Sequence, residues 1–272
     1  GNALHHLPVV AIVAADGVHS TLSRLMGVEL FTEKAMAKGI EYEMVAHRKL
    51  PSAMQIFLEP EVGLGYGWII PKGPRRANVG LAAIGLTGNR RDRLQEWLST
   101  NPLVMRYFEA DHVLEVKTGD APIPGFLGGP RRGNVLFAGD AAGQTLAFVG
   151  EGIMPSYICG QGAGAVAAAA VRFNDVDRLD CYEQAVDDLM GDELAGGGAL
   201  KDIILDVWTD QNISEGDRTV LCGLLMSEVI FPEQIEEARE LLSLSNYKMV
   251  QAIKDIVARR KIRATVSALR LR

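Results

Sequence analysis

Residues 133–152 read GNVLFAGDAAGQTLAFVGEG, and this stretch decides the fold. It opens with the apolar run 133–139, which predicts a buried strand of a parallel sheet. Asp140 follows directly, at the carboxyl edge of the sheet, where open α/β sheets bind ligands. A helix starting near Gly152, with Pro155 in its first turn, would direct free N–H groups and a positive dipole end to the same place. The stretch predicts a ligand site, although a helix cap with tight packing would explain the same spacing.

The residues before this stretch predict a second sheet inserted into the first. Residues 7–15 (LPVVAIVAA) form another apolar, β-branched run, which ends in an Asp-Gly turn. Between about 37 and 84 the pattern changes to short alternating strands separated by turns, which is typical of an antiparallel sheet. Residues 90–99 predict an amphipathic helix, with a break at the proline that follows. Together these segments predict a parallel-sheet domain interrupted by an antiparallel one.

The rest of the chain is predicted to be mainly helical. From about Leu179 the pattern is helical, with a break between two helices at the three glycines 196–198. Residues 152–171 carry no charge, but Ala and Gly dominate the segment and are weak membrane anchors. We therefore favour a helix in a soluble core over a membrane span. Gly160 and Gly164 form a GxxxG pattern, which we interpret as close helix packing rather than dimerisation in a membrane.

The composition limits the classes of function. The 272 residues carry a formal net charge of −6 with a pI near 5.5, which argues against a nucleic-acid binder. Cys159, Cys181 and Cys222 are far apart and form no CxxC pair. We therefore expect a reduced, intracellular protein without a disulfide framework. The histidines show no ligand spacing either, and we predict no metal site.

Two motifs resemble the FAD fingerprints of the p-hydroxybenzoate hydroxylase superfamily. Residues 139–143 read GDAAG, with a glycine-rich turn shortly after, and residues 15–20 read ADGVHS. Each motif follows a predicted buried strand, and the two stand in the order that this superfamily uses. The resemblance implies a Rossmann-like FAD-binding domain, in which a helix N-terminus suits the negative charge of a reduced flavin.

A third motif narrows the resemblance to the geranylgeranyl reductase family. Residues 66–71 read YGWIIP, and Gly80 follows after eight intervening residues, which is similar to that family's YxWxFP…GxG signature. Ile70 and Ala82 depart from the signature, which puts the shape of the pocket in doubt. In the resembling family these strands line a prenyl pocket beside the flavin, and strand alternation places both aromatic residues and Ile70 on one face. From periodicity alone, the aromatic residues could equally belong to the core of the sheet.

The resemblance implies a cofactor, a substrate and a set of site residues. The cofactor is FAD, reduced by NAD(P)H or ferredoxin, and the substrate is a geranylgeranyl lipid. Asp140 would hold the ribityl chain, Asp16 would face the phosphate–ribityl region, and no residue stands out as catalytic proton donor. The cofactor-binding residues are expected to be Asp16, Gly17, Gly139, Asp140, Gly150, Gly152 and Ile153. The prenyl-binding residues are expected to be Tyr66, Trp68, Ile70, Pro71 and Gly80.

The implied fold class is α/β with α+β elements, arranged in three regions. Residues 1–26 and 130–178 would form a partial, discontinuous FAD-binding domain, residues 27–129 an antiparallel-sheet substrate domain, and residues 179–272 a C-terminal helical region. The GxGxxG loop that opens such a domain does not occur after an opening strand. We therefore expect that this segment belongs to a longer protein or to another chain, and that the isolated chain binds FAD weakly.

One departure lies inside the cofactor motif. The family pattern after GDAAG usually carries Asn-Pro and a run of glycines, whereas residues 144–152 read QTLAFVGEG. Glu151 would repel a reduced flavin unless its carboxylate points away or pairs with a basic group. This departure weakens the transfer of residue roles around the flavin ring.

The C-terminal residues 248–272 combine basic side chains with apolar residues near helical spacing. Such a helix could rest on an anionic membrane surface and help to draw in a lipid, or it could be a solvated packing helix. We expect a cytoplasmic protein, peripheral on the membrane if this helix binds.

The resemblance predicts an oxidoreductase that saturates double bonds of geranylgeranyl chains in lipid biosynthesis. Two alternatives stay open. A flavin-dependent monooxygenase of the same superfamily would share both FAD motifs, although the YGWIIP motif argues against it. A non-catalytic remnant that binds only a lipid or a partner would explain the missing GxGxxG segment.

Overall fold

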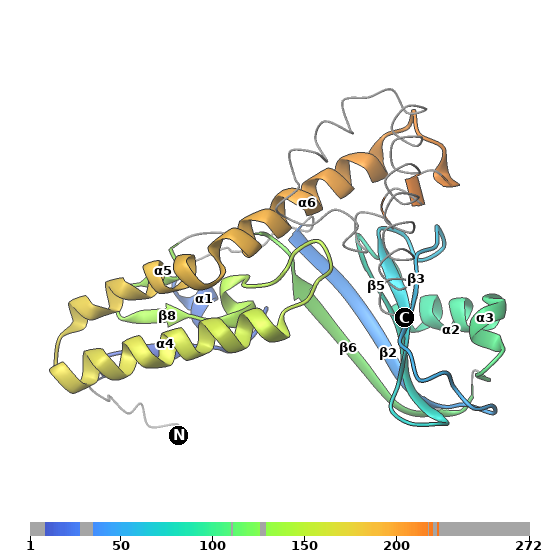
Figure 1. The fold of residues 1–272 in the computed structure, drawn as a ribbon, viewed down its shortest axis with the longest axis horizontal. Helices are drawn as coiled ribbons and strands as arrows, with labels where there is room; N and C mark the ends of the chain where they lie inside the picture. Colours follow the sequence, from blue (N-terminus) through green and yellow to red (C-terminus); the bar gives the residue numbers. More distant parts are fainter. Residues whose placement is uncertain are drawn as a thin grey trace, which may run out of the picture. The chain divides into compact units, whose positions relative to one another are not determined.

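The computed structural model describes residues 9–27, 35–109, 111–125, 129–216, 218–219 and 222. These residues form two compact units, and each is described by itself (Figure 1). The first contains the described residues up to Ala37 and Asp120–Gly198, and the second contains Lys38–Gly119 and the described residues from Ala199 onward. The domain boundaries expected after residues 26, 129 and 178 remain a prediction. The expected α/β class is confirmed, because the chain combines helices with a parallel strand pair and an antiparallel sheet.

The sheet of the first unit joins the two apolar runs on either side of the insertion. Its strand order is β1 (Ile12–Ala14), β8 (Val135–Phe137) and β7 (Arg131–Arg132). β1 and β8 are parallel, with Ala14 opposite Phe137. The turns that follow the two strands therefore leave the sheet at the same edge, which brings the ADGVHS and GDAAG motifs together.

Helices cover this small sheet. They are α1 (Thr21–Leu25), the 3-10 turn η2 (Gly139–Ala142), α4 (Ile153–Phe173), η3 (Val176–Asp180), α5 (Cys181–Val186), the π-helical turn η4 (Asp187–Gly191) and, as far as Gly198, the first part of α6 (Asp192–Thr209). Leu136 of β8 packs with Cys159 and Ala163 of α4 and with Tyr182 of α5 in one buried cluster. The apolar run of β8 is thus buried by the helix that its own turn leads into.

The three glycines 196–198 do not break the helix, contrary to the expectation from sequence. α6 runs through them without interruption (Figure 1). A Cβ on Gly198 would lie 2.8 Å from the Cα atom of Gly125, and one on Gly197 would lie 3.3 Å from the backbone nitrogen of Ala147. Glycine is therefore used here because two backbones pass too closely for a side chain.

α4 is the uncharged segment that resembles a membrane span. No helix in the described part of the chain is long and apolar enough to cross a membrane. The GxxxG pair does not mediate close packing as expected, because a Cβ on Gly160 or on Gly164 would meet nothing within 4 Å.

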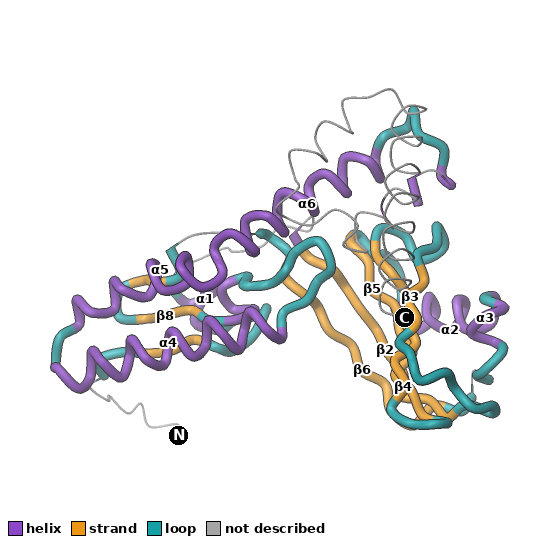
Figure 2. Tube along the Cα trace, in the orientation of Figure 1, coloured by secondary structure: helices purple, strands orange, loops and turns teal. Residues whose placement is uncertain are grey.

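The second unit is built on a five-stranded sheet with the order β3 (Gln55–Phe57), β4 (Gly65–Pro71), β5 (Arg76–Ile84), β2 (Met36–Val45) and β6 (Val113–Pro122) (Figure 2). β3, β4 and β5 are antiparallel neighbours, as the alternating pattern predicts. Helices α2 (Arg90–Thr100) and α3 (Pro102–Met105) pack one face of the sheet through Leu94, Trp97 and Val104. Pro102 begins α3 rather than only ending α2, because the Asn101 side chain accepts hydrogen bonds from the N–H groups of Leu103 and Val104.

The two faces of this sheet differ in chemistry. Ile40, Tyr42, Ile69 and Val79 point into the core with the helices. On β2 a glutamate, Glu43, alternates with these core residues. It is buried and pairs with Lys72 and Arg76, which lower the pKa of its carboxyl group.

Candidate functional site

A pocket of about 640 Å³ lies in the first unit, at the sheet edge where the two motifs meet. Six of the seven residues expected to bind the cofactor line it, and Asp16 is the exception. The size is within the range of small-molecule and cofactor sites. The lining residues are Val13, Ala15, Gly17, Ala121, Ala138, Gly139, Asp140, Thr145, Gly150, Gly152, Ile153, Ser156 and Gly160.

Asp140 is the acidic residue of this pocket. Burial raises the pKa of its carboxyl group. No described residue donates a hydrogen bond to this carboxylate, so it is available to a ligand that carries hydroxyl or N–H donors. Gly139 before it has a left-handed backbone, with φ of 65°, and a Cβ there would lie 2.9 Å from Ser156 Oγ. The turn therefore needs glycine both for its conformation and for its contact with α4.

Asp16 is used by its own helix. Its Oδ2 atom accepts hydrogen bonds from the N–H groups of Thr21 at 2.7 Å and Leu22 at 3.4 Å. Burial acts to raise the pKa of Asp16, but hydrogen bonds from Ser20, Thr21 and Leu22 outweigh it, and the pKa is lowered. Asp16 thus orders the turn that carries Gly17, and its contact with a cofactor remains a prediction.

A side-chain pair beside the pocket was not expected from the sequence. His19 Nε2 lies 2.9 Å from Asp120 Oδ2. The next residue after Asp120, Ala121, lines the pocket, as does Gly17 two positions before His19. The two residues are 101 positions apart, and no sequence pattern links them.

The first N–H groups of α4 are not free, contrary to the expectation from sequence, because the side chain of Glu151 binds them. Its Oε1 atom accepts hydrogen bonds from the N–H groups of Ile153 at 2.7 Å and Met154 at 3.0 Å. The carboxylate therefore binds the positive end of its own helix instead of a basic group. Leu146 forms an isolated antiparallel bridge with Glu151. Its backbone N–H donates a hydrogen bond to the carbonyl oxygen of Glu151, which closes the loop between the two residues.

A buried network supports the GDAAG turn from behind. Gln144 Oε1 accepts a hydrogen bond from the N–H of Gly139 at 2.7 Å. Gln144 also contacts the hydroxyl of Tyr182, which donates to the carbonyl oxygen of Phe137 in β8. The hydroxyl group of Thr145, the residue after Gln144, donates a hydrogen bond to the carbonyl oxygen of Pro122. The side chain of Gln144 thus holds the turn in place.

The residues expected to bind a prenyl chain lie in the second unit, and all but Pro71 are on the side of the sheet away from the helices. Pro71, at the end of β4, lies opposite the core residue Ala77. We call the side away from the helices the Trp68 face; its described residues include Glu41, Glu43, Tyr66, Trp68, Ile70, Arg76, Asn78, Gly80 and Ala82. Trp68 lies opposite Gly80, and its ring centroid is 5.9 Å from that of Tyr66. Neither aromatic residue belongs to the core of the sheet. How the Trp68 face and the pocket of the first unit work together remains a prediction.

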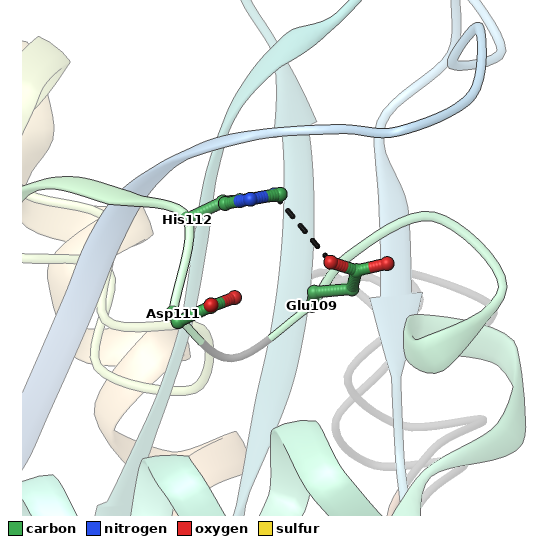
Figure 3. Close-up of side chains that lie close together, drawn as sticks. All are labelled: Glu109, Asp111 and His112. Atoms are coloured by element: carbon green, nitrogen blue, oxygen red, sulfur yellow. Dashed lines mark ion pairs between the residues drawn. The ribbon is translucent and has the colours of Figure 1, made fainter.

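A group of acidic side chains and a histidine lies after α3. Glu109, Asp111 and His112 have ligand atoms within 4.8 Å of one another, and His112 Nδ1 is 3.9 Å from Glu109 Oε2 (Figure 3). All three side chains are exposed. Exposed ion pairs of this kind are common at protein surfaces, and we assign no metal site to them.

Comparisons with known proteins point to one family. Residues 35–120 match the geranylgeranyl reductase catalytic domain. The digeranylgeranylglycerophospholipid reductase 1 of Methanopyrus kandleri is 31% identical over 179 residues, which are 64% of this chain and 47% of the relative. The digeranylgeranylglycerophospholipid reductase of Methanococcus aeolicus is 35% identical over 63% of this chain and 44% of the relative. The chain spans about half the length of the curated relatives it matches.

A solved structure shares the fold. The geranylgeranyl bacteriochlorophyll reductase-like protein of Thermoplasma acidophilum superposes with a TM-score of 0.70 at 19% sequence identity. The superposition covers 90% of this chain and 62% of that protein.

Proposed function

Because residues 35–120 match the geranylgeranyl reductase catalytic domain and the chain is similar to geranylgeranyl phospholipid reductases, we propose that it forms part of a flavin-dependent reductase that saturates prenyl double bonds in lipid biosynthesis. One observation carries the proposal. The ADGVHS and GDAAG motifs, more than 100 positions apart in the sequence, line a single pocket at the edge of the parallel strand pair. The names of the relatives, which are reductases of a geranylgeranyl phospholipid, indicate the substrate class.

The residues of the pocket fit FAD. Asp140 offers a carboxylate that no described side chain uses, which suits a ligand with several hydroxyl groups. Glycines on two sides of the pocket, Gly17 and Gly152, leave room for a flat ring system against the backbone. Gly150 and Ile153 would border the ring, and Asp16 would act by holding the turn of Gly17 in place.

The chemistry of the reaction belongs to the cofactor, and the chain orients it. When bound, a reduced flavin supplies a hydride for an alkene carbon, while a proton has to reach the neighbouring carbon. The pocket residues fix the cofactor, and the Trp68 face supplies apolar and aromatic surface for the prenyl chain. Gly80 shapes that face, because it leaves space for the Trp68 ring, and β4 ends at Pro71. The electron donor, NAD(P)H or ferredoxin, remains a prediction.

FAD titration tests the cofactor pocket. We expect the protein expressed from its complete reading frame to bind FAD, and Asp140→Asn to weaken binding roughly tenfold, the effect of one buried hydrogen bond to a charged group. Asp177→Asn changes an exposed carboxylate outside the pocket and serves as the matched control. Equal FAD affinity in all three proteins would remove Asp140 from the site.

An anaerobic assay tests the reaction. We expect the reduced, FAD-loaded protein to saturate a geranylgeranyl lipid without oxygen. Oxygen consumption with an aromatic substrate, and no prenyl reduction, would instead favour a monooxygenase. A protein from the complete reading frame that binds no flavin would favour a non-catalytic lipid-binding or partner-binding role.

We also propose peripheral membrane contact through residues 248–272, which lie outside the described residues. The proposal rests on their basic and apolar sequence pattern. We expect co-sedimentation with anionic liposomes to fall when these residues are removed. Equal binding of the shortened and the intact protein would refute membrane contact through this segment.

A further inference from the structure

The Trp68 face holds two buried polar atoms without a hydrogen-bond partner in the part of the chain that the structure describes. They are the indole Nε1 of Trp68 and the amide Oδ1 of Asn78. Unpaired buried polar atoms are rare in folded proteins, because they have lost water and gained nothing in exchange. A group that pairs with both atoms when it is bound would account for them.

The sheet register places the two residues on the same side of the sheet. Trp68 of β4 lies directly opposite Gly80 of β5, and Asn78 is two positions from Gly80, so its side chain is on the same face. A Cβ on Gly80 would lie 2.5 Å from Cζ2 of Trp68 and 2.7 Å from Cβ of Glu41. Glycine therefore lets the indole ring lie across β5, close to β2.

A neighbouring carboxylate fixes which atom of Asn78 is left unpaired. Asn78 Nδ2 donates a hydrogen bond to Glu41 Oε1 at 3.1 Å, and Lys117 Nζ lies 3.8 Å from the same oxygen. An ionised carboxylate can only accept hydrogen bonds, so the amide must present its NH₂ group to Glu41. The amide oxygen of Asn78 is then left as a hydrogen-bond acceptor to which no described residue donates.

We infer that Trp68 and Asn78 form a polar subsite for one hydroxyl group on the Trp68 face. The indole N–H only donates and the amide oxygen only accepts, so the complementary ligand both accepts and donates. A hydroxyl group does both, whereas an ether oxygen serves only the indole and a hydrocarbon serves neither. The hydroxyl can come from a prenyl alcohol or from an ordered water; the first source rests on the proposed function.

Calorimetric titration with geranylgeraniol and with its methyl ether separates these ligands. We expect the protein to bind the alcohol roughly tenfold more tightly than the ether, because only the alcohol satisfies Asn78. Asn78→Leu should abolish this preference by weakening the alcohol alone. Trp68→Phe should weaken both ligands to a similar degree and keep the preference.

Two further variants guard against indirect effects. Gln55 carries the third unpaired buried oxygen but lies opposite Ile69, on the core side of the sheet, so Gln55→Leu should leave the preference unchanged. If Asn78→Leu does not fold, Glu41→Gln serves in its place. A neutral amide at position 41 no longer fixes the orientation of Asn78, and the preference for the alcohol should fall.

A crystal structure of the ligand-free protein completes the test. A preference that depends on Asn78 assigns the hydroxyl to the ligand. Equal binding of alcohol and ether, with an ordered water bonded to both Trp68 Nε1 and Asn78 Oδ1, assigns it to water. Equal binding without such a water overturns the inference. If neither prenyl compound binds, the proposed prenyl substrate is refuted. An ordered water bonded to both atoms would then still confirm the subsite, and its absence would refute it.

Discussion

At the residue scale, the partly buried carboxylate of Asp140 is unfavourable for folding, although we propose that it binds the cofactor. Its carboxylate is partly buried without a hydrogen-bond donor among the described residues, and burial raises its pKa. A raised pKa means that the folded state holds the proton more tightly than the unfolded state. The contribution of Asp140 to stability therefore falls as the pH rises from its ordinary pKa of 3.8 through the raised value, and it stays unfavourable at neutral pH.

We predict that Asp140→Asn raises the free energy of unfolding at neutral pH although it weakens FAD binding. The gain over the unsubstituted protein should shrink as the pH falls through the raised pKa, and it should vanish well below the ordinary pKa of 3.8, where the carboxyl group is protonated in both states. Urea unfolding at several pH values measures this difference. A gain that does not change with pH would show that burial of the charge is not its cause.

Glu151 offers a second prediction at this scale, because its carboxylate occupies the N-terminus of α4. Glu151→Gln keeps an oxygen that can accept from Ile153 and Met154 but removes the charge. We expect a loss of about 0.3–1 kcal/mol in unfolding free energy, the usual size of a charge–dipole interaction. On the proposed function, the same variant should bind reduced FAD more tightly, because it removes a negative charge that lies between the pocket residues Gly150 and Gly152 in the chain.

Thermal unfolding and a flavin titration check the two effects separately. Unchanged stability in Glu151→Gln would contradict the helix-capping role. Unchanged affinity for reduced FAD, with the loss of stability present, would show that the carboxylate stays remote from the flavin.

At the element scale, α6 shows how close packing can outweigh local preference. We predict that Gly198→Ala destabilises the protein by about 1–3 kcal/mol, although alanine favours helices, because its Cβ would lie 2.8 Å from the Gly125 backbone. Gly164→Ala in α4 is the matched control, since a Cβ there meets nothing within 4 Å. It should stabilise by up to about 1 kcal/mol. If urea unfolding shows that both variants are more stable than the unsubstituted protein, the contact with Gly125 can relax.

At the scale of the whole molecule, the cysteines report on the two units separately. Burial raises the pKa of Cys159 in the first unit to about 11. Burial also raises the pKa of Cys222 in the second unit to about 12, although Arg218 opposes the shift. Cys181 is exposed. Since thiolates are the reactive form, the two buried thiols should be inert in the native state.

We predict that a thiol reagent modifies Cys181 of the native protein quickly. It should modify Cys159 and Cys222 only when denaturant unfolds their units. Peptide mapping across a urea series then shows whether Cys159 and Cys222 become reactive together or in sequence. Rapid modification of all three thiols without denaturant would refute the burial of both.

Much of the candidate site follows from local sequence patterns. The apolar runs of β1 and β8 and the small residues after them identify the pocket, because buried strands and tight turns leave strong local signals. Other features of the site depend on partners far apart in the chain. The His19–Asp120 pair and the Gly125–Gly198 contact are examples. Composition and periodicity hold no information about such pairs, and for that reason the three glycines of α6 resemble a helix break in the sequence.

The sequence by itself determined the resemblance to the geranylgeranyl reductase catalytic domain, the parallel strand pair and most of the residues that line the pocket, since each depends on short motifs with local physical causes. Only the tertiary structure decided how those residues are used. It placed the Glu151 carboxylate on the N-terminus of α4 and left the polar atoms of Trp68 and Asn78 unpaired on one face. The reason is physical: hydrogen bonding and burial depend on which atoms meet in space, and spacing along the chain does not fix those meetings.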